Sequence, residues 1–219
     1  MNASAWILVV VFLAVAAFDW IGVHLGSKRV EYVAKPGCML FLIGAALVMD
    51  PSDDAARVAL VVALVLSMVG DSFLMLPGRE QDSAGPNLFV AGLAAFLLAH
   101  VAYVVGFALD GIEPASLLLG LLPLFVIVVF AARPIVQGVD SSDEAGLAAP
   151  VKAYIGVISA MVLAAFGTGD VRAMAGALLF AFSDSLIALG RFVRPRDWYP
   201  LAVIITYHLA QALLTVSFT

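Results

Sequence analysis

The sequence has few charged residues and almost no cysteine. Of its 219 residues only 12% are Asp, Glu, Lys or Arg, whereas 63% are hydrophobic. Soluble domains carry about 25% charged and about 45–50% apolar residues, so a water-soluble globular protein is excluded. The one cysteine, Cys38, excludes an internal disulfide and a zinc site built from cysteines. The composition therefore predicts an all-α integral membrane protein with no separate soluble domain.

Several catalytic signatures are also missing. There is no GxSxG motif for a nucleophilic serine, and no HExxH or HxxxH pair for a zinc ion. Val69-Gly70-Asp71 resembles part of the GxGD motif of intramembrane aspartyl proteases, but Met68 stands in place of the first glycine. The Tyr-Asp and Pro-Ala-Leu motifs of that class are absent as well, so we set it aside and predict no metal.

Apolar segments long enough to cross a bilayer follow one another along the chain. Seven of them are about Ala5–His24, Ala55–Leu76, Leu88–Leu109, Ala115–Ala132, Leu147–Phe166, Val171–Phe192 and Trp198–Phe218. The first has no basic region before it, which predicts a retained span rather than a cleaved signal. An eighth segment, Gly37–Met49, has 13 residues, the length of a re-entrant or short buried helix, and Pro36 suits its first turn.

The basic residues decide whether Gly37–Met49 crosses the membrane. With eight spans, only Arg57 and Arg172 fall in the even-numbered loops, and nine fall in the odd-numbered ones: Lys28, Arg29, Lys35, Arg79, Arg133, Lys152, Arg191, Arg194 and Arg196. Without that crossing the division is five against six, which is no bias. We therefore predict eight spans in the cytoplasmic (inner) membrane, with cytoplasmic odd loops and both termini outside. The longest loop, about Arg133–Ala145, is predicted to be polar and mobile.

Polar residues recur in the same order in the two halves of the chain. The pairs are Lys35 and Lys152, Asp71 and Asp184, and His100 and His208, at offsets of 117, 113 and 108 residues. This order favours a parallel repeat of four spans each, 1–110 and 111–219, within a single transmembrane domain of residues 1–219. Chance likeness between apolar helices is the alternative.

Two carboxyl groups lie at membrane depth. Asp71 occurs in the phrase SMVGDSFLML and Asp184 in GALLFAFSDSLIALG. An acidic side chain at the centre of a bilayer costs about 2.5–3.5 kcal/mol on insertion scales, so such a residue usually has a function. We predict that Asp71 and Asp184 are the catalytic residues; a structural hydrogen-bonded pair is the alternative.

Further polar residues fall at mid-depth or on the cytoplasmic side of the predicted spans. They are His100, His208, Tyr103, Tyr207, Gln211, Ser67, Ser183 and Asp19, and in a bundle they could line one cavity that opens to the cytoplasm. The alternatives are hydrogen bonds between helices for the histidines, bonds to the backbone for the serines, and a helix cap for Asp19 with His24. The basic residues predicted to face a lipid phosphate, or else only to snorkel or mark topology, are Lys35, Lys152, Arg191 and Arg194.

The sequence resembles the YhhN family of multi-pass membrane proteins, which includes lysoplasmalogenases. The resemblance extends from residue 35 to residue 211 and rests on Lys35-Pro36, SMVGDSFLML, FVAGLAAFLLAHVAY, GALLFAFSDSLIALGRF and the run from Tyr207 to Gln211. It implies eight helices and hydrolysis of the vinyl ether bond of lysoplasmalogens, which yields a fatty aldehyde and a glycerophospho-head group. The implied partners are a lysophospholipid and membrane lipid, with no nucleic acid.

Two embedded carboxyl groups suit that reaction. A vinyl ether is hydrolysed by protonation of its β-carbon, which leaves an oxocarbenium ion that water captures. A neutral acid beside an anion serves such a reaction, as in glycoside hydrolysis, and no cofactor is required. Which aspartate is the acid stays open. The alternatives are a non-catalytic lipid-binding protein and a proton-coupled transporter, because embedded acids and histidines also form proton relays. Against a transporter, no span is broken by proline with glycine, and Pro123 is the one clear internal proline.

Overall fold

Helices that cross the membrane make up most of the structure, a computed structural model that describes residues 1–76 and 88–219. Eight helical spans in these residues are long and apolar enough to cross a bilayer, which confirms the predicted all-α class of a multi-pass membrane protein. The spans are α1 Ala3–His24, α2 Lys28–Val48, α3 Asp54–Met75, α4 Leu88–Asp110, a fifth over Pro114–Asp140, a sixth over Ala145–Gly167, α9 Val171–Phe192 and α10 Tyr199–Ser217. The sixth span comprises the 3-10 turn η3 Ala145–Leu147 and α8 Ala148–Gly167.

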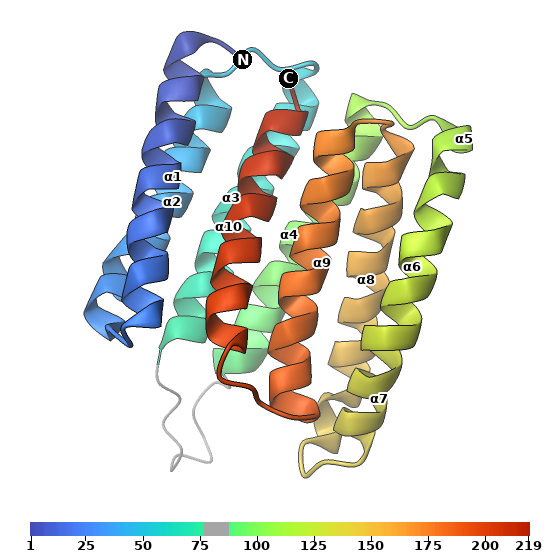
Figure 1. Cartoon of the computed structure of the whole chain (residues 1–219). Helices are drawn as coiled ribbons and strands as arrows, with labels where there is room; N and C mark the ends of the chain where they lie inside the picture. Colours follow the sequence, from blue (N-terminus) through green and yellow to red (C-terminus); the bar gives the residue numbers. More distant parts are fainter. Residues whose placement is uncertain (77–87) are drawn as a thin grey trace.

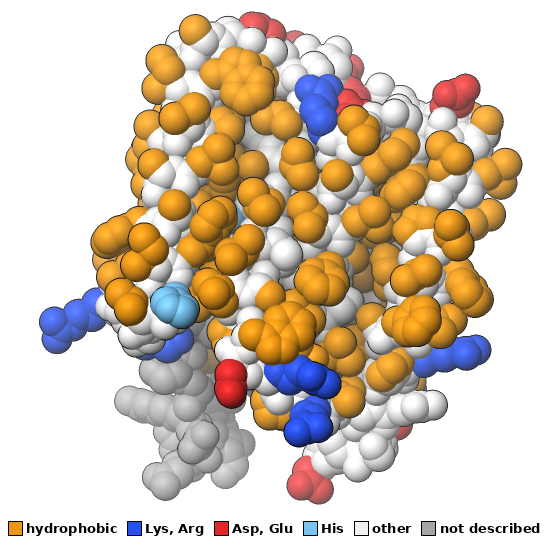
Figure 2. Space-filling view, in the orientation of Figure 1, with side chains coloured by type: hydrophobic (Ala, Val, Ile, Leu, Met, Phe, Trp, Pro, Cys, Tyr) orange, Lys and Arg blue, Asp and Glu red, His pale blue; other side chains and the backbone are white. Residues whose placement is uncertain are grey.

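Both chain ends lie at the same end of the bundle, as an even number of crossings requires (Figure 1). Arg57 and Arg172 lie in the first turns of α3 and α9, at the end of the termini. The other basic residues of the described chain belong to the opposite half, and Arg79 lies outside the described residues. Figure 2 shows hydrophobic side chains over the middle of the molecule and charged ones toward its two ends. The side that faces the cytoplasm stays a prediction, as does the internal repeat.

Helix α2 is longer than the 13-residue segment expected from its apolar run. It has 21 residues, and Pro36 lies inside it, so the placement of Pro36 in a first turn was wrong. Its first two turns were not predicted, because they carry charged residues and so fall outside the apolar run. These charged residues pair with one another along the helix. Glu31 lies 2.7 Å from the Lys28 ammonium and 3.6 Å from that of Lys35. These spacings of three and four residues place the side chains on one helix face.

The fifth span also continues beyond its predicted end. It comprises α5 Pro114–Leu117, η1 Leu118–Gly120, α6 Leu121–Ile127, the π turn η2 Val128–Ala132 and α7 Arg133–Asp140. The expected long loop over Arg133–Ala145 was therefore wrong, since most of it is helix. Ile135 and Val139 of α7 are buried against Val151 and Phe192. Pro134 has no N–H to donate to the carbonyl of Phe130, and the π turn that precedes it accommodates this break in the helix pattern.

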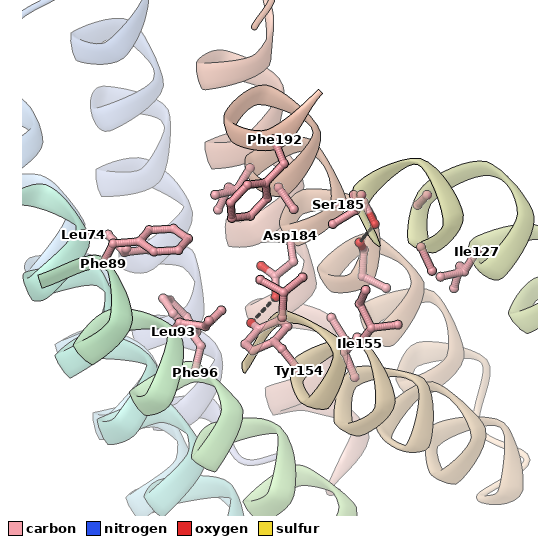
Figure 3. A pocket seen from close by; sticks show the side chains of 18 residues that line it. Leu74, Phe89, Leu93, Phe96, Ile127, Tyr154, Ile155, Asp184, Ser185 and Phe192 are labelled. Carbon is pink, nitrogen blue, oxygen red and sulfur yellow. Dashed lines mark hydrogen bonds between the residues drawn. The ribbon is translucent and has the colours of Figure 1, made fainter. Parts of the chain in front are cut away.

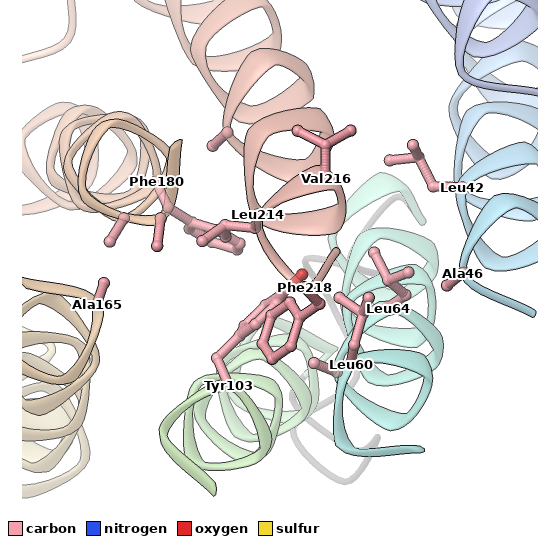
Figure 4. Packing of buried hydrophobic residues seen from close by; sticks show 14 of the residues in the cluster. Leu42, Ala46, Leu60, Leu64, Tyr103, Ala165, Phe180, Leu214, Val216 and Phe218 are labelled. Atoms are coloured by element: carbon pink, nitrogen blue, oxygen red, sulfur yellow. The ribbon is translucent and has the colours of Figure 1, made fainter. Parts of the chain in front are cut away.

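Small residues and aromatic rings bring the central helices together. A Cβ added at Gly92 of α4 would lie 2.8 Å from Leu74 Cδ2 of α3, so these helices approach too closely for alanine. In the core shown in Figure 4, Phe218 of the C-terminal end lies beside Tyr103, Leu60 and Leu64. Its ring also stacks on Phe107 at 5.2 Å between centroids. This packing holds α3, α4, α9 and α10 around the polar residues of the candidate functional site.

Candidate functional site

A polar cavity of about 320 Å³ lies among α2, α3, α4, α9 and α10. Its lining includes the first residue of α2, Lys28, and the last residue of α3, Met75, so it reaches the end of the bundle opposite the termini. Asp71 and Asp184 both line it. Two acids that are 113 residues apart in the sequence therefore share one cavity within the membrane-spanning part of the fold.

Asp71 is held from α10. The Tyr207 hydroxyl donates a hydrogen bond to Asp71 Oδ2 at 2.6 Å and also lies 3.5 Å from Met39 Sδ. Asp71 is only 5% exposed. The positive charge of Lys35, which lines the same cavity, acts on this carboxyl group. Burial and the negative charge of Glu31 favour a neutral carboxyl group at Asp71, whereas the hydroxyl donor and the Lys35 cation favour a carboxylate.

Asp184 is held from α8. The Tyr154 hydroxyl donates a hydrogen bond to Asp184 Oδ2 (Figure 3). His100 Nε2 of α4 lies 3.7 Å from the same oxygen, which is too far for a hydrogen bond. The His100 ring is fully buried and packs edge-on against Tyr154 and Phe180, at 5.2 and 4.7 Å between centroids. Among the described residues, Asp184 is therefore surrounded by aromatic rings on this side, with the Tyr154 hydroxyl as its donor.

A second, apolar cavity of about 70 Å³ adjoins Asp184. Figure 3 shows its wall, in which Ile127 of the fifth span and Ile155 of α8 stand across from Leu93 of α4. The residues that line both cavities are Leu74, Phe89, Phe96, Asp184 and Ile187. Asp184 therefore lies where a polar and an apolar cavity meet.

The predicted phosphate ligands divide into two groups. Lys35 and Arg191 line the polar cavity. The Arg191 guanidinium pairs with Glu144 and lies 3.8 Å from the centroid of the Phe89 ring. Lys152 and Arg194 do not line the cavity. Lys152 instead pairs with exposed Asp140, at 2.9 Å between Nζ and Oδ1.

Three other predicted residues are buried in the bundle away from both cavities. Tyr103 donates a hydrogen bond to Gln211 Oε1, and neither side chain is exposed. His208 Nδ1 accepts a hydrogen bond from Trp20 Nε1 at 3.0 Å, so the proton of its neutral ring is on Nε2. The structure places none of these three residues in a hydrogen bond to a carboxylate. Their contacts favour the alternative role, in which they form hydrogen bonds between helices.

The predicted serines and Asp19 have separate surroundings. Ser183 lines the polar cavity, but its hydroxyl donates to the Val203 carbonyl at 3.0 Å. Ser67 is fully buried and its Oγ has no hydrogen-bond partner among the described residues. Asp19 is fully buried with both oxygens likewise unpartnered, so the idea that it caps α1 together with His24 finds no support. The charges of Lys35 and Asp71 act on the Asp19 carboxyl group.

Sequence reasoning missed Tyr154, Trp20, Glu31 and Lys28. The depth of Tyr154 in the membrane could have indicated it. Tyr154 lies near the start of the sixth span and Asp184 near the end of the antiparallel seventh, so the two residues lie at the same depth. Lys28 and Glu31 were read as loop residues because α2 was predicted to begin later. In the part of the chain that the structure describes, no group of three or more His, Cys, Asp or Glu residues could hold a metal ion.

Comparison with known proteins gives a consistent set of relatives. The family model described as the YhhN family matches residues 30–218. The chain is 35% identical over 179 residues to a human protein named lysoplasmalogenase TMEM86B, which is 82% of this chain and 71% of that protein. It is 33% identical over 200 residues to a Mycobacterium tuberculosis protein named lysoplasmalogenase, which is 90% of this chain and 74% of that protein. The match to mouse lysoplasmalogenase TMEM86B, at 33% identity, spans 61% of that protein. No solved structure matches the chain.

Proposed function

The chain belongs to the YhhN family, and from this we propose that it is a membrane-embedded lysoplasmalogenase. Such a hydrolase cleaves the vinyl ether bond of a lysoplasmalogen and releases a fatty aldehyde and a glycerophospho-head group. The human and mycobacterial relatives that carry this name support the proposal. The observation in the structure that carries it is the presence of Asp71 and Asp184 in the lining of one cavity.

The chemistry requires an acid and a base within reach of one substrate. Protonation of the β-carbon needs a neutral acid, and capture of the resulting cation needs a carboxylate that steadies the charge and orients water. Asp71 and Asp184 supply two such groups in one cavity. Tyr207 and Tyr154 each hold one carboxyl group in a fixed orientation, which favours productive geometry.

The two cavities suit the two parts of a lysolipid. In our proposal the phosphate of the head group binds in the polar cavity near Lys35 and Arg191, and Lys28 adds a third positive charge there. The first carbons of the alkenyl chain lie in the apolar cavity of about 70 Å³ between α4, α8 and the fifth span. Lys152 and Arg194 lie outside this headgroup site and serve the topology of the chain.

We further propose that the polar cavity opens to the cytoplasm and that the protein resides in the cytoplasmic membrane with both termini outside. The excess of basic residues at the cavity end supports this orientation. Single cysteines introduced at the exposed residues Arg29 and Gly146, in a Cys38→Ser background, should react with a membrane-impermeant thiol reagent only after the membrane is opened. Labelling at these positions in intact cells would instead indicate the opposite orientation.

Aldehyde release by the purified protein tests the activity. We expect aldehyde from lysoplasmenylethanolamine and none from the saturated alkyl ether analogue, which cannot form an oxocarbenium ion by protonation. Asp71→Asn and Asp184→Asn should each lose activity by about 100- to 10,000-fold, since general acid–base groups contribute about 10²–10⁴. Asp140→Asn, at an exposed carboxylate outside both cavities, is the matched control and should keep full activity.

Two outcomes would count against the enzyme. Wild-type protein that releases no aldehyde from any lysoplasmalogen would remove the proposed activity. Full activity in folded Asp71→Asn or Asp184→Asn would remove the proposed site. Proton-driven uptake of a substrate into liposomes without hydrolysis would instead favour a transporter.

A further inference from the structure

The two carboxyl groups of the site occupy unequal positions. Asp184 lines both the polar and the apolar cavity, whereas Asp71 lines only the polar one. Because the vinyl ether joins the head group to the chain, a lysolipid with its head in the polar cavity and its chain in the apolar cavity has the reacting bond at their junction. Asp184 is the carboxyl group at that junction.

The surroundings of the two carboxyl groups also differ, in a way that agrees with these positions. Both carboxyl groups are buried, which favours the neutral form of each, and each accepts from a tyrosine hydroxyl. The positive charge of Lys35, partly offset by Glu31, favours the anion at Asp71, whereas the charged group that acts on Asp184 is Asp71 itself. Around Asp184 are one hydroxyl donor, Tyr154, the uncharged ring edges of the aromatic cluster and the apolar wall. Apolar surroundings favour the neutral form of a carboxyl group.

From this placement we propose that Asp184 is the acid that protonates the β-carbon and that Asp71 is the carboxylate that activates water. The assignment rests on the proposed lysoplasmalogenase function. The β-carbon is the first carbon of the chain beyond the double-bonded carbon that carries the ether oxygen, so it lies on the apolar side of the junction, next to Asp184. The other carbon of the double bond, which water attacks, lies on the side of Asp71 and of the polar cavity.

The steps balance without any further reactant. Asp184 gives its carboxyl proton to the β-carbon, and the π electrons of the double bond form the new C–H bond, which leaves an oxocarbenium ion. Asp71 takes a proton from a water molecule whose oxygen bonds to the cationic carbon, and a hemiacetal results. The hemiacetal hydroxyl then returns a proton to Asp184, while Asp71 protonates the departing glycerol oxygen as the C–O bond breaks. One water is consumed and both carboxyl groups regain their starting forms.

The reverse assignment fits the cavities less well. For Asp71 to protonate the β-carbon, the first part of the hydrocarbon chain would have to lie among Lys35, Glu31 and Tyr207 in the polar cavity. Asp184 would then have to activate water beside the apolar wall formed by residues such as Ile155 and Phe96. The first placement puts a hydrocarbon in polar surroundings, and the second puts a water molecule in apolar surroundings. Each costs free energy.

The pH dependence of kcat/KM distinguishes the two roles. Activity that needs ionised Asp71 falls as the pH decreases, and activity that needs neutral Asp184 falls as the pH increases, so the wild type should give a bell-shaped profile. The residual activity of Asp71→Asn should lack the fall at low pH, and that of Asp184→Asn should lack the fall at high pH. The opposite pairing of variants and limbs would overturn the assignment.

Other titratable groups face the pair, and one of them supplies a control. They are Asp19 on α1, Glu31 and Lys35 on α2, His100 on α4, Tyr154 on α8 and Tyr207 on α10, with Lys28 and Arg191 also lining the polar cavity. Glu31→Gln should keep both limbs of the profile, whatever its rate. Loss of one limb in Glu31→Gln would assign that limb to Glu31 and overturn our proposal.

Infrared spectroscopy tests the same assignment without turnover. The resting wild-type protein at neutral pH should show C=O stretching bands of neutral, buried carboxylic acids, and Asp184→Asn should remove one of them. Because Asp19 is also fully buried, Asp19→Asn identifies the band of Asp19 and should leave the band of Asp184 in place. Asp71→Asn should leave it in place; its loss in Asp71→Asn would overturn the assignment even if both variants are inactive. Failure of the proposed function is a separate result, because it requires that the wild type release no aldehyde.

Discussion

The hydrogen bond from Tyr154 to Asp184 leads to a quantitative prediction. In the proposed mechanism Asp184 gives up its proton, so the carboxyl oxygen that accepts from Tyr154 gains negative charge in the transition state. A hydrogen bond between neutral groups contributes about 0.5–1.5 kcal/mol, and one to a charged group about 1.5–3 kcal/mol. The bond therefore strengthens by about 1–1.5 kcal/mol as the reaction proceeds, and only such a difference accelerates the chemical step.

Tyr154→Phe removes this difference and little else. At about 1.4 kcal/mol for each factor of ten, kcat should fall about 5- to 13-fold. KM should change little, because the lost stabilisation develops after substrate is bound. The measurement is the initial rate of aldehyde release over a range of lysoplasmenylethanolamine concentrations, with thermal unfolding in detergent to establish that the variant is folded.

Tyr103→Phe is the matched control. Tyr103 is also buried and also donates to a side chain, but its partner is Gln211, and neither residue lines a cavity. This variant should lose about 1–3 kcal/mol of stability, because Gln211 Oε1 is left buried without a donor, and kcat should stay unchanged. Equal losses of kcat in Tyr103→Phe and Tyr154→Phe would refute the reasoning, as would an unchanged kcat in Tyr154→Phe.

Two further predictions concern packing and pH. In Gly70→Ala the new Cβ would lie 2.6 Å from Phe96 Cδ2, so we expect a loss of about 1–3 kcal/mol in thermal unfolding and lower activity, because Phe96 lines both cavities. Gly156→Ala, with no atom within 4 Å, should be neutral or up to about 1 kcal/mol more stable. Asp170 caps α9, and although burial alone would raise its pKa, hydrogen bonds from Arg172 lower that pKa overall. Its contribution is therefore present at neutral pH and lost as the pH falls through its lowered pKa, so the unfolding temperatures of wild type and Asp170→Asn should differ at pH 7 and converge near pH 2.

The spans could be predicted because each crossing needs about 20 apolar residues and the basic residues gather in alternate loops. The prediction was wrong where local interactions replace hydrophobicity. The first turns of α2 carry Lys28, Glu31 and Lys35, in which both lysines pair with the one glutamate, and a search for apolar runs does not detect such turns. Residues 133–140 contain Arg, Pro, Gln, Gly and Asp, but Ile135 and Val139 are buried and extend the fifth span as a helix.

The site could be predicted in part. An acid within an apolar helix is conspicuous in a sequence, so Asp71 and Asp184 were found, and the structure places them in one cavity. Tyr154 was not found, because tyrosine is common near membrane interfaces and its partner is 30 residues away. The apolar cavity is formed by side chains from α4, α8, α9 and the fifth span, and no spacing along the chain reveals such an assembly.

The meeting of the two cavities at Asp184 also bears on where the fragments go after cleavage. In the proposed reaction the glycerophospho-head group is left in the polar cavity at the charged end of the bundle, and the aldehyde is left beside the fifth span at the outer edge of the fold (Figure 1). Each fragment thus starts next to the phase in which it dissolves. Departure into separate phases keeps the two from recombining and draws the equilibrium toward hydrolysis.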